Sequence, residues 1–459
     1  MAISGSSTSR RSFVKSMVST AAAATLAAPA IIRAADPTEK PEATTSSKEK
    51  LRLAFIGTGG IGGMHIDEFS KLGIVVPCYC DVDSSHWTEA KKRWPEAKGY
   101  QDYREMIDKE GKNFDAAVIG IPDHHHYPAT ILAMKAGKAT YTQKPLTHTV
   151  WESRQLALAA KKYKVATQMG NQGHGKEGWR LVYEWVRSGA LGTIKEVHSW
   201  TNRPIWPQGI KRPDGEDPVP ATLNWDCWIG AAPMRPYKND TYHPFKWRGW
   251  WDFGAGALGD MAAHTMDGMF WALDAFDPVS VEPVAMADMN GETFPKSGVM
   301  KWHFAAKGDR PAFDGFWYEG GLKPQRPPEL EGNRKMPETG NLFIGTKATI
   351  LIQGDYGDSP RIIPETKMKE IGKPPKMLER SPGNYVEWVS AAKGEKPLDY
   401  CKSNFGYAGP MCECMILGNI AMRLGRKLDW DGPNLTVTNV PEANKFVNKE
   451  YRDGWKFEI

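Results

Sequence analysis

Cysteine is scarce in this chain, with only six in 459 residues. Such a low content excludes a disulfide-dense scaffold of the kind that stabilises small secreted domains. Cys78 with Cys80, and Cys412 with Cys414, have C-x-C spacing, which differs from the C-x-x-C spacing of many zinc and redox sites. We therefore expect buried free thiols and no cysteine-bound metal.

Beyond its first 35 residues the chain also lacks a long apolar run, an internal repeat and a strong net charge. No stretch there has 18 consecutive apolar residues, so nothing predicts a membrane-spanning helix. The formal net charge of +5 falls to about +1 without Arg10, Arg11, Lys15 and Arg33 of the N-terminal segment. This balance gives no support for a nucleic-acid or polybasic membrane partner.

The first 35 residues resemble a twin-arginine export signal. They contain the pair Arg10 and Arg11, then a short apolar stretch of small residues, and then alanine-rich cleavage options near Ala34 and Ala35. Residues 36–50 have the sequence DPTEKPEATTSSKEK, which is typical of a polar linker. We expect residues 1–35 to be removed after export by the twin-arginine machinery, and the mature protein to be periplasmic or otherwise exported.

The whole chain is 41% hydrophobic and 25% charged, which is an ordinary globular composition, and the part after residue 50 is long enough for two domains. Over residues 51–170, segments of helical length separate the apolar runs LRLAFIG, IVVPCYC, FDAAVIGIP, KATYTQ and KVATQMG. This alternation predicts a Rossmann domain with a doubly wound parallel sheet. Residues 171–459 contain period-2 stretches such as VEPVAMADM and GVMKWHFAA. They predict a C-terminal α+β domain with a large, mostly antiparallel sheet, on which the helical stretch PMCECMILGNIAMRLGRKL would pack.

The first strand leads into a glycine-rich turn that suits a dinucleotide. The predicted phosphate loop consists of Gly57, Thr58, Gly59, Gly60, Ile61 and Gly62. Its glycines in G-x-G-x-x-G register turn the chain, let a pyrophosphate approach the backbone and bring helix against strand. Asp81 ends the next strand, where a carboxylate binds the ribose 2′-hydroxyl and repels a 2′-phosphate. The sequence therefore predicts NAD rather than NADP.

A second polar pattern interrupts the apolar helical stretch GALGDMAAHTMDGMFWAL over residues 256–273. Asp260, His264 and Asp267 recur at spacings of four and three, so at about 100° per residue they share one helix face. We expect this face to line a cleft while the rest of the helix is packed. The alternative is a buried pair of Asp260 and His264 without chemistry.

Three further motifs resemble the glucose-fructose oxidoreductase, inositol dehydrogenase and MocA family (Gfo/Idh/MocA). Members carry Pro-Asn/Asp-x-x-His, then Gly-Lys, then Glu-Lys-Pro. The corresponding motifs here are Pro122-Asp123-His124-His125-His126, Gly137-Lys138 and Gln143-Lys144-Pro145. The run GALGDMAAHTMD resembles the family's Asp-x-x-x-His helix, and NWDCWIG, WRGWWDFG and YRDGW resemble its exported bacterial members. Gln143 replaces the family's glutamate, which leaves the lysine in place but changes its electrostatic surroundings.

The resemblance implies roles for several residues. NAD would bind the phosphate loop and a further set of residues, namely Asp81, Pro122, Asp123, His126, Gln143 and Lys144. Hydride transfer from an alcohol needs a base for the hydroxyl proton and a cation for the developing alkoxide. By resemblance, His264 exchanges this proton and Lys144 positions the hydroxyl and stabilises its charge, while Asp260 orients the imidazole and contacts the sugar.

Four residues are candidates for substrate binding: Asn171, His174, Trp251 and Asp267. The first two follow the last parallel strand, at the edge where ligands gather, and ordinary loop hydrogen bonding is the alternative. Trp251 belongs to a tryptophan-rich region, of which one or two rings are expected to stack on a sugar and the rest to be core. Asp267 is expected to support the site or to be a structural hydrogen-bond partner.

The run His124-His125-His126 does not predict a metal site, because consecutive loop residues rarely point at one ion and no acidic or cysteine cluster accompanies them. We expect no metal. By resemblance His126 lies near the nicotinamide, and His124 and His125 are expected to be exposed.

Together the motifs favour an NAD-dependent oxidoreductase that transfers hydride between the nicotinamide and a secondary hydroxyl of a sugar, glycoside or polyol. Two alternatives stay open: an NAD-dependent glycoside hydrolase using transient oxidation and elimination, and a redox-inactive sugar-binding protein. Export to a compartment without free NAD predicts a tightly bound cofactor. Because family members often pair through the open face of the second sheet, the resemblance implies a homodimer or homotetramer.

Overall fold

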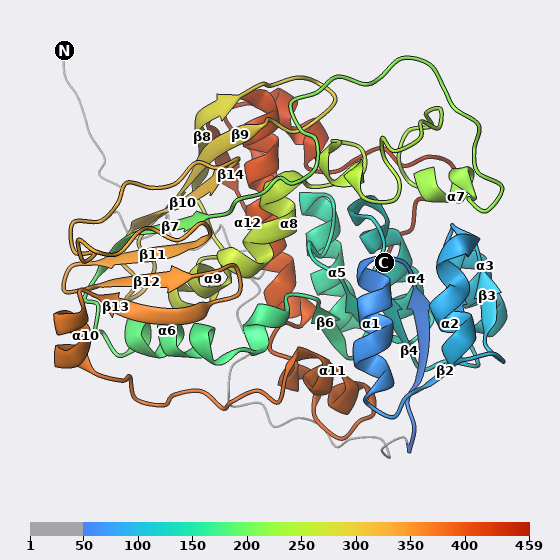
Figure 1. Ribbon diagram of the computed structural model, residues 1–459, viewed down its shortest axis with the longest axis horizontal. Coiled ribbons are helices and arrows are strands. Elements are labelled where there is room, and N and C mark those ends of the chain that lie inside the picture. Colours follow the sequence, from blue (N-terminus) through green and yellow to red (C-terminus); the bar gives the residue numbers. More distant parts are fainter. Residues whose placement is uncertain (1–48) are drawn as a thin grey trace, which may run out of the picture. The chain divides into compact units, whose positions relative to one another are not determined.

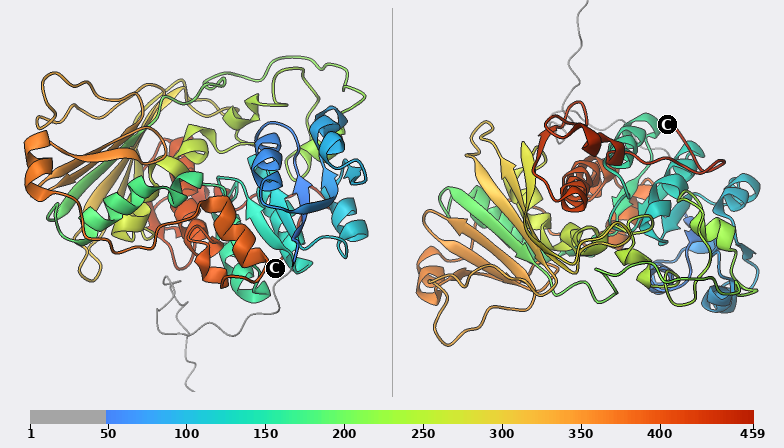
Figure 2. Two further views of the ribbon diagram at one scale, coloured as in Figure 1. Left: turned by 60° about the horizontal axis from the view of Figure 1, so that its bottom comes forward. Right: turned by 90° about the horizontal axis from the view of Figure 1, so that it is seen from above.

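Two β-sheets with helices around them make up residues 49–459, which are the residues that the computed structural model describes (Figures 1 and 2). The expected export signal and nearly all of the expected linker lie outside the described residues. Within residues 49–459, no helix is both long and apolar enough to cross a membrane.

The first sheet is parallel throughout, with the strand order β3-β2-β1-β4-β5-β6. Its strands are β1 (Arg52–Ile56), β2 (Val75–Cys80), β3 (Lys98–Tyr100), β4 (Ala116–Ile119), β5 (Ala139–Thr142) and β6 (Thr167–Met169). The predicted doubly wound sheet is confirmed, although β3 is absent from the prediction because its three residues form no apolar run. The order reverses between β1 and β4, and ligands bind at such a switch point.

Helices connect these strands. They are α1 (Ile61–Ser70), α2 (Thr88–Arg93), α3 (Tyr103–Glu110), α4 (His126–Lys135) and α5 (Val150–Tyr163). A capping box begins α5, since Thr149 accepts from the backbone of Glu152, whose side chain accepts from Thr149 in turn. By contrast, α1 follows Gly60 and has no side-chain cap. Its first N–H groups are therefore available to a ligand.

The second sheet has nine strands in the order β13-β12-β11-β7-β10-β9-β8-β14-β15. They are β7 (Ile194–Trp200), β8 (Ser280–Ala287), β9 (Ser297–Phe304), β10 (Phe313–Glu319), β11 (Gly340–Gly345), β12 (Thr349–Gln353), β13 (Asp358–Ile363), β14 (Leu428–Asp431) and β15 (Thr436–Val437). Apart from the parallel pair β7 and β10, the neighbours are antiparallel, as predicted. Buried and half-buried residues alternate along β9 and β10, so one face is packed.

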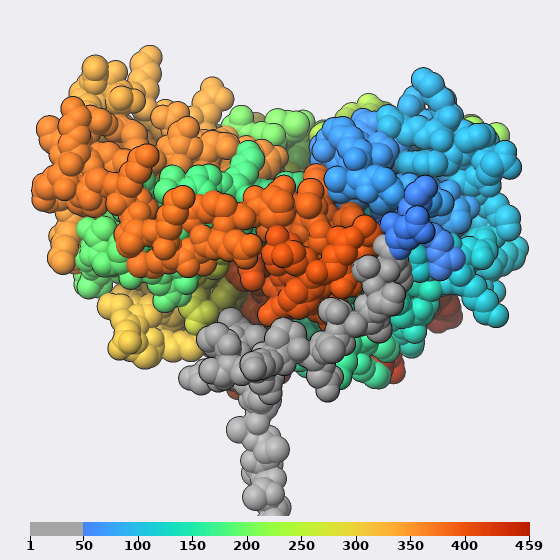
Figure 3. All heavy atoms as spheres, turned by 90° about the horizontal axis from the view of Figure 1, so that it is seen from below, coloured from blue at the N-terminus to red at the C-terminus, as the bar shows by residue number. Residues whose placement is uncertain are grey.

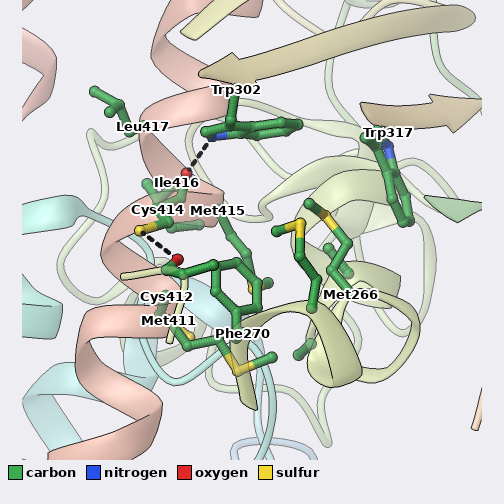
Figure 4. Packing of buried hydrophobic residues seen from close by; sticks show 14 of the residues in the cluster. Met266, Phe270, Trp302, Trp317, Met411, Cys412, Cys414, Met415, Ile416 and Leu417 are labelled. Carbon is green, nitrogen blue, oxygen red and sulfur yellow. Dashed lines mark hydrogen bonds between the residues drawn. The ribbon is translucent and has the colours of Figure 1, made fainter. Parts of the chain in front are cut away.

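Helices cover the packed face of this sheet. They are α6 (Glu177–Arg187), α8 (Gly256–Thr265), α9 (Asp267–Leu273) and α12 (Phe405–Leu424). Helix α12 packs against α5, α8 and β8 and so joins the two sheets. Figure 4 shows the core beside it, where Trp302 Nε1 donates to the Cys414 carbonyl at 3.0 Å. All six cysteines are buried and free, which confirms the expectation from their spacing.

The helix expected over residues 256–273 is divided into α8 and α9 at Met266. Asp267 is the first residue of α9, where the helix dipole favours a carboxylate. The two acids and His264 therefore do not form one continuous helical stripe.

Two long connections cross between the sheets. The strap, which we define as residues 201–255 with α7 (Trp225–Ile229), runs from β7 to α8 and back over the first sheet. Its Asn224 N–H donates to the Val82 carbonyl at 2.8 Å, and its Thr222 carbonyl accepts from the Ser84 N–H at 2.9 Å. On another face, the segment from α10 (Glu365–Ile371) to α11 (Asn384–Ala392) extends from the second sheet towards α1 (orange in Figure 3).

Candidate active site

A cavity of about 350 Å³ lies where β1, β2, β4 and β5 end, beneath the strap. Of the sequence-predicted site residues, it is lined by Gly57, Gly59, Gly60, Ile61, Asp81, Pro122, Asp123, His126, Gln143, Lys144 and Asp260. The structure thus brings the predicted cofactor residues together, apart from Thr58 and Gly62, which support the loop from behind.

The phosphate loop has no room for side chains. Gly57 has a φ of +93°, and a Cβ on it would lie 2.2 Å from the Gly120 carbonyl oxygen. A Cβ on Gly62 would lie 2.2 Å from the Gly57 carbonyl oxygen. The backbone is therefore exposed to the cavity at the uncapped start of α1, whose N–H groups and helix dipole suit a pyrophosphate.

Asp81 is fixed against this loop. Its Oδ2 accepts from Thr58 N at 2.9 Å and from Gly59 N at 3.2 Å, and its Oδ1 lies 3.4 Å from His86 Nδ1. Burial acts to raise the pKa of Asp81, but His86 and the backbone donors outweigh it and hold the pKa below its usual value. The ionised carboxylate suits a ribose diol and opposes a 2′-phosphate.

Asp123 joins the first domain to the start of α8. Its Oδ2 accepts from Ala255 N at 2.9 Å. Burial raises the pKa of Asp123 to about 7, with Asp260 adding to the effect and Arg248 and Lys144 opposing it. Asp123 is therefore largely protonated below neutral pH, in contact with the cavity.

His126 ties the loop after β4 to the segment after β5. Its Nδ1 lies 2.6 Å from the Pro145 carbonyl oxygen and its Nε2 lies 2.8 Å from that of Ile121. Burial lowers the pKa of His126 to about 4, although the hydrogen bonds with these carbonyls act to raise it. The ring is therefore neutral and donates to one of the two carbonyls. Its contacts position Lys144, which directly precedes Pro145.

Lys144 reaches across to the second sheet's helices. Its Nζ donates to the Asp260 carboxylate at 2.8 Å and to the Asp260 carbonyl at 2.6 Å. Arg248 of the strap approaches the same carboxylate at 3.5 Å. Burial acts to raise the pKa of Asp260, but these two cations lower it below its usual value. Two cations thus share one carboxylate at the end of the cavity.

His264 lies one turn beyond Asp260 on α8. Its ring is 2% exposed, and its Nδ1 is buried without a hydrogen-bond partner in the described part of the chain. Burial, followed by the charge of Lys144, puts the pKa of His264 well below its usual value. The ring stands 4.7 Å from that of Tyr356 and is not among the cavity-lining residues. The imidazole is therefore neutral before any reaction, and the lowered pKa makes it a weaker base than an ordinary histidine.

The Gln143 side chain forms hydrogen bonds with the backbone N–H of Lys144 and with His65, and not with the Lys144 ammonium. Its Oε1 accepts from the Lys144 N–H at 2.9 Å, and its Nε2 lies 2.9 Å from His65 Nε2 on α1. Burial lowers the pKa of His65 to about 3, so this ring is neutral and can accept from the amide. The amide therefore links the phosphate-loop helix to Lys144 without adding a charge.

The four substrate candidates do not line the cavity. His174 Nδ1 lies 2.9 Å from Asp267, whose carboxylate also accepts from the Tyr407 hydroxyl at 2.6 Å, and all three belong to one buried cluster. Asn171 accepts from the Ser403 hydroxyl and is fully buried. The Trp251 ring packs 3.6 Å from Phe294. The structure shows these residues in contacts within the protein, and their roles in substrate binding stay predictions.

His124 and His125 are buried, so the expectation that they are exposed is wrong. Each places Nε2 about 3 Å from the Trp228 carbonyl oxygen of the strap, at 3.0 and 2.9 Å. A Cβ on Gly230 would lie 1.9 Å from the His125 ring, so the strap can pass there only as glycine. The histidine run therefore anchors the strap.

Sequence reasoning did not identify the roof of the cavity. The strap supplies Cys227, Trp228, His243, Pro244, Phe245, Trp247 and Arg248, and the segment after β2 supplies His86. The Arg248 guanidinium lies over the Trp247 ring at 4.3 Å and the Phe245 ring at 4.6 Å, which are cation–π distances. In the sequence, the aromatic stretch HPFKWRGWW could have indicated the roof, but no local pattern predicts that this stretch extends over the first domain.

One group in residues 49–459 could gather donor atoms around a metal ion, namely Asp83, His86 and His243, whose donor atoms lie within 4.8 Å of one another. His243 Nε2 lies 3.1 Å from Asp83 Oδ2, and this hydrogen bond joins the strap to the segment after β2. The absence of a bound metal stays a prediction.

The chain belongs to the Gfo/Idh/MocA oxidoreductase family. Residues 51–171 match the model described as "Oxidoreductase family, NAD-binding Rossmann fold", and residues 186–302 match "Oxidoreductase family, C-terminal alpha/beta domain". The first domain is thus an NAD-binding Rossmann domain, and NAD is its cofactor. The glycine cradle, the uncapped α1 and Asp81 fit this cofactor.

Curated relatives include glycosidases. The chain is 30% identical over 157 residues to the alpha-N-acetylgalactosaminidase of Shewanella oneidensis, which covers 32% of this chain and 34% of that protein. It is 30% identical over 205 residues to a glycosyl hydrolase family 109 protein of a Shewanella species, covering 40% and 44%. The chain thus matches only about a third to somewhat under half of these relatives' length.

Solved structures with the same fold include WlbA dehydrogenases, each in complex with NADH and UDP-GlcNAcA. The Bordetella pertussis structure has a TM-score of 0.58 at 17% identity and covers 83% of this chain and 99% of that one. The Chromobacterium violaceum structure has a TM-score of 0.60 at 18% identity and covers 84% and 98%. A levoglucosan dehydrogenase in complex with NADH and levoglucosan has a TM-score of 0.53 at 16% identity and covers 83% and 99%. At these identities the similarity establishes the fold alone.

Replacing Asp81 with Asn should weaken NAD binding about 10- to 100-fold, because charge-assisted hydrogen bonds to the ribose are lost. The preference for NAD over NADP should fall at the same time, since the charge that repels a 2′-phosphate is gone. Calorimetric titration of nucleotide-stripped protein with both cofactors measures this. The exposed Asp67→Asn on α1 is the control, and an unchanged preference would contradict the role of Asp81.

Replacing Asp123 with Asn should stabilise the protein relative to wild type as the pH rises from about 4.5 to 8. The carboxyl has a pKa of about 7 in the folded chain, against about 3.9 when unfolded. Folding therefore retains its proton across this range, and the wild type loses stability as pH rises. The amide does not titrate and can still accept from Ala255.

The free energy of unfolding of the Asp123→Asn variant, relative to that of the wild type, should increase by roughly 2–4 kcal/mol over this range. Urea titrations at several pH values, on samples with equal nucleotide content, measure it, with the exposed Asp67→Asn as the control variant. A constant difference would show that the carboxyl at position 123 titrates normally.

Proposed function

We propose that the protein is an NAD-dependent oxidoreductase that transfers hydride between a secondary hydroxyl of a sugar, glycoside or polyol and a tightly bound nicotinamide cofactor. The contact of Lys144 Nζ with Asp260 at 2.8 Å, with His264 one turn further along α8, carries the proposal. A cation and a carboxylate line the end of the cavity, and a neutral imidazole lies one helical turn away.

In this mechanism the bound NAD supplies the hydride acceptor. Lys144 donates a hydrogen bond to the substrate hydroxyl and stabilises the negative charge that develops on its oxygen. His264, whose ring is neutral before reaction, accepts the hydroxyl proton as the negative charge develops on the oxygen. Asp260 holds the ammonium in place and accepts from a neighbouring hydroxyl. In the reducing direction the imidazolium returns the proton.

Retention of the cofactor is supported by the strap. Its aromatic residues form a roof over the cavity, and hydrogen bonds with His124, His125 and Val82 fix it to the first domain. An exported enzyme meets no free NAD pool, so a covered cofactor that is regenerated in place suits the export signal expected in residues 1–35. We propose a periplasmic location on this basis, with a homodimer or homotetramer formed through the open face of the nine-stranded sheet.

A second candidate is an NAD-dependent glycoside hydrolase, which the names of the curated relatives favour. Oxidation of a sugar hydroxyl to a ketone acidifies the neighbouring C–H. Loss of that proton expels the glycosidic oxygen and forms a C=C bond, to which water adds. Return of the hydride then restores the alcohol. This route consumes water and no external oxidant, and it uses the same lysine and histidine.

Protein purified from the periplasm of cells that express the full chain should contain close to one nucleotide per chain by absorbance and mass spectrometry. His264→Asn should retain it, and both Lys144→Ala and His264→Asn should lower the rate of substrate-dependent nicotinamide reduction by about 10²–10⁴-fold, because the cation or the base is lost. Asp67→Asn should match the wild type. Variants with wild-type activity would contradict the catalytic roles of Lys144 and His264. Protein that is purified without nucleotide and binds NAD weakly would contradict the retained cofactor.

Aryl glycosides distinguish the two candidates. The oxidoreductase should produce reduced nicotinamide and an oxidised glycoside with the aglycone still attached. The hydrolase should release the aglycone over many turnovers without net reduction of the cofactor. Product mass and nicotinamide absorbance, followed in one reaction with Lys144→Ala as the blank, report both at once.

A further inference from the structure

A tight turn of the second sheet faces the His264 side of the site. Residues 354–357 have the sequence Gly-Asp-Tyr-Gly and join β12 to β13, with φ values of +76° at Gly354 and +73° at Gly357. A Cβ on Gly357 would lie 2.7 Å from the Trp179 indole. A Cβ on Gly173 would lie 3.3 Å from the Tyr356 backbone. Close packing on these glycines fixes where the turn sits.

Tyr356 is the residue of this turn that meets the proposed base. Its ring centroid lies 4.7 Å from that of His264, with the two planes at 57°. Lys176 Nζ stands 4.9 Å from the ring centroid and pairs with Asp358 at 3.0 Å. The ring is half-buried, and its hydroxyl has no hydrogen-bond partner among residues 49–459. A phenol hydroxyl without a partner, on a ring that contacts the proposed base, can bind a substrate hydroxyl.

Asp355 carries the second polar group of the turn. Its Oδ1 is buried and has no partner within the described residues. Burial raises the pKa of Asp355 and the charge of Asp260 adds to this, whereas the charges of Arg203 and Lys144 and a hydrogen bond with Thr339 oppose it. The Asp355 carboxyl therefore lies within the field of the Lys144–Asp260 pair. An unsatisfied buried acceptor such as its Oδ1 is costly unless a ligand supplies a donor.

Charged groups surround this side of the site. Lys144 and Arg248 share the Asp260 carboxylate, and the charge of Arg203 acts on Asp355. Lys176 is paired with Asp358, which follows the turn. A substrate carboxylate or phosphate at the turn would face the Asp355 carboxyl, while the nearest cations are already paired with carboxylates. Hydroxyl groups, in contrast, can donate to the carboxyl oxygens and accept from Lys144 and Tyr356.

We propose that the turn Gly354–Gly357 is the specificity wall of the active site, where Asp355 and Tyr356 bind hydroxyl groups next to the reacting carbinol of an uncharged sugar. The proposal rests on the proposed oxidoreductase function and names its substrate class. In this proposal, Lys144, Asp260 and His264 act at the reacting carbon. The turn determines which sugar ring can bind beside them.

The test uses purified holoprotein and a panel of methyl glycosides of glucose, galactose, mannose and N-acetylgalactosamine, together with methyl glucuronide and methyl galacturonide. Calorimetry measures binding, and nicotinamide absorbance measures hydride transfer. The variants are Asp355→Asn and Tyr356→Phe. Asp67→Asn on α1 is the control, since it removes one exposed carboxylate outside the turn and leaves the Lys176–Asp358 pair beside Tyr356 intact.

For the best neutral glycoside, Asp355→Asn should raise Kd and KM about 10- to 100-fold, and Tyr356→Phe about 3- to 10-fold, because a hydrogen bond to the ligand is lost. The kcat should change less than KM, and the nucleotide content should not change. Removal of the Asp355 carboxyl should also raise the affinity for the uronide relative to the neutral glycoside. A merely structural role of the turn would not produce this change in selectivity.

The outcomes separate this inference from the proposed function. If neutral glycosides bind and the variants weaken binding while the nicotinamide is never reduced, the specificity wall stands and the oxidoreductase function fails. If neutral glycosides react and both variants keep the wild-type KM and selectivity, the function stands and the wall is wrong. Wild-type protein that prefers uronides, or that binds no member of the panel, also overturns the wall.

Discussion

The ion pair of Lys144 and Asp260 is the interaction on which the site depends. Lys144 follows β5 of the first sheet and Asp260 lies on α8 against the second, and their side chains are only 15% and 14% exposed. Charges removed from water to this extent cost several kcal/mol unless they are paired and hydrogen-bonded. The ammonium satisfies this condition with both the carboxylate and the carbonyl of Asp260. The pair therefore fixes the lysine to the helix that also carries His264.

The charges of this pair also act on the pKa values of His264 and Asp123. Burial chiefly, and then the charge of Lys144, lower the pKa of His264 while Asp260 opposes them, so the imidazole is neutral and does not become a second cation. Asp123, on the other side, has its pKa raised partly by Asp260, so a third acid near the pair does not add a full negative charge. Burial and one shared carboxylate thus divide the roles of cation, base and neutral donor among neighbouring side chains.

Local chemistry explains which parts could be predicted from the sequence. The phosphate loop, Asp81 and Lys144 are specified by short segments at strand ends, where backbone geometry and spacing suffice to place them. The prediction from helical periodicity failed at Asp267. Its carboxylate begins α9, where the helix dipole and the contact with His174 stabilise it, and does not continue α8. Sequence reasoning missed the strap and the turn that carries Tyr356, because their positions depend on residues far away in the chain. The strap is held by His124 and His125, and the turn packs against Gly173 and Trp179.

The strap also constrains the kind of reaction that this site can support. Opening this roof would separate the Trp228 carbonyl from the Nε2 atoms of His124 and His125, which fits the proposed retention of the cofactor. An enzyme that keeps its nicotinamide must reoxidise it in the same cavity, either with a second substrate or within one catalytic cycle. Both routes need one set of residues that works in the oxidising and the reducing direction. A neutral imidazole that accepts a proton and later returns it, beside a lysine whose charge is held by Asp260 throughout, meets this requirement without a change of partner.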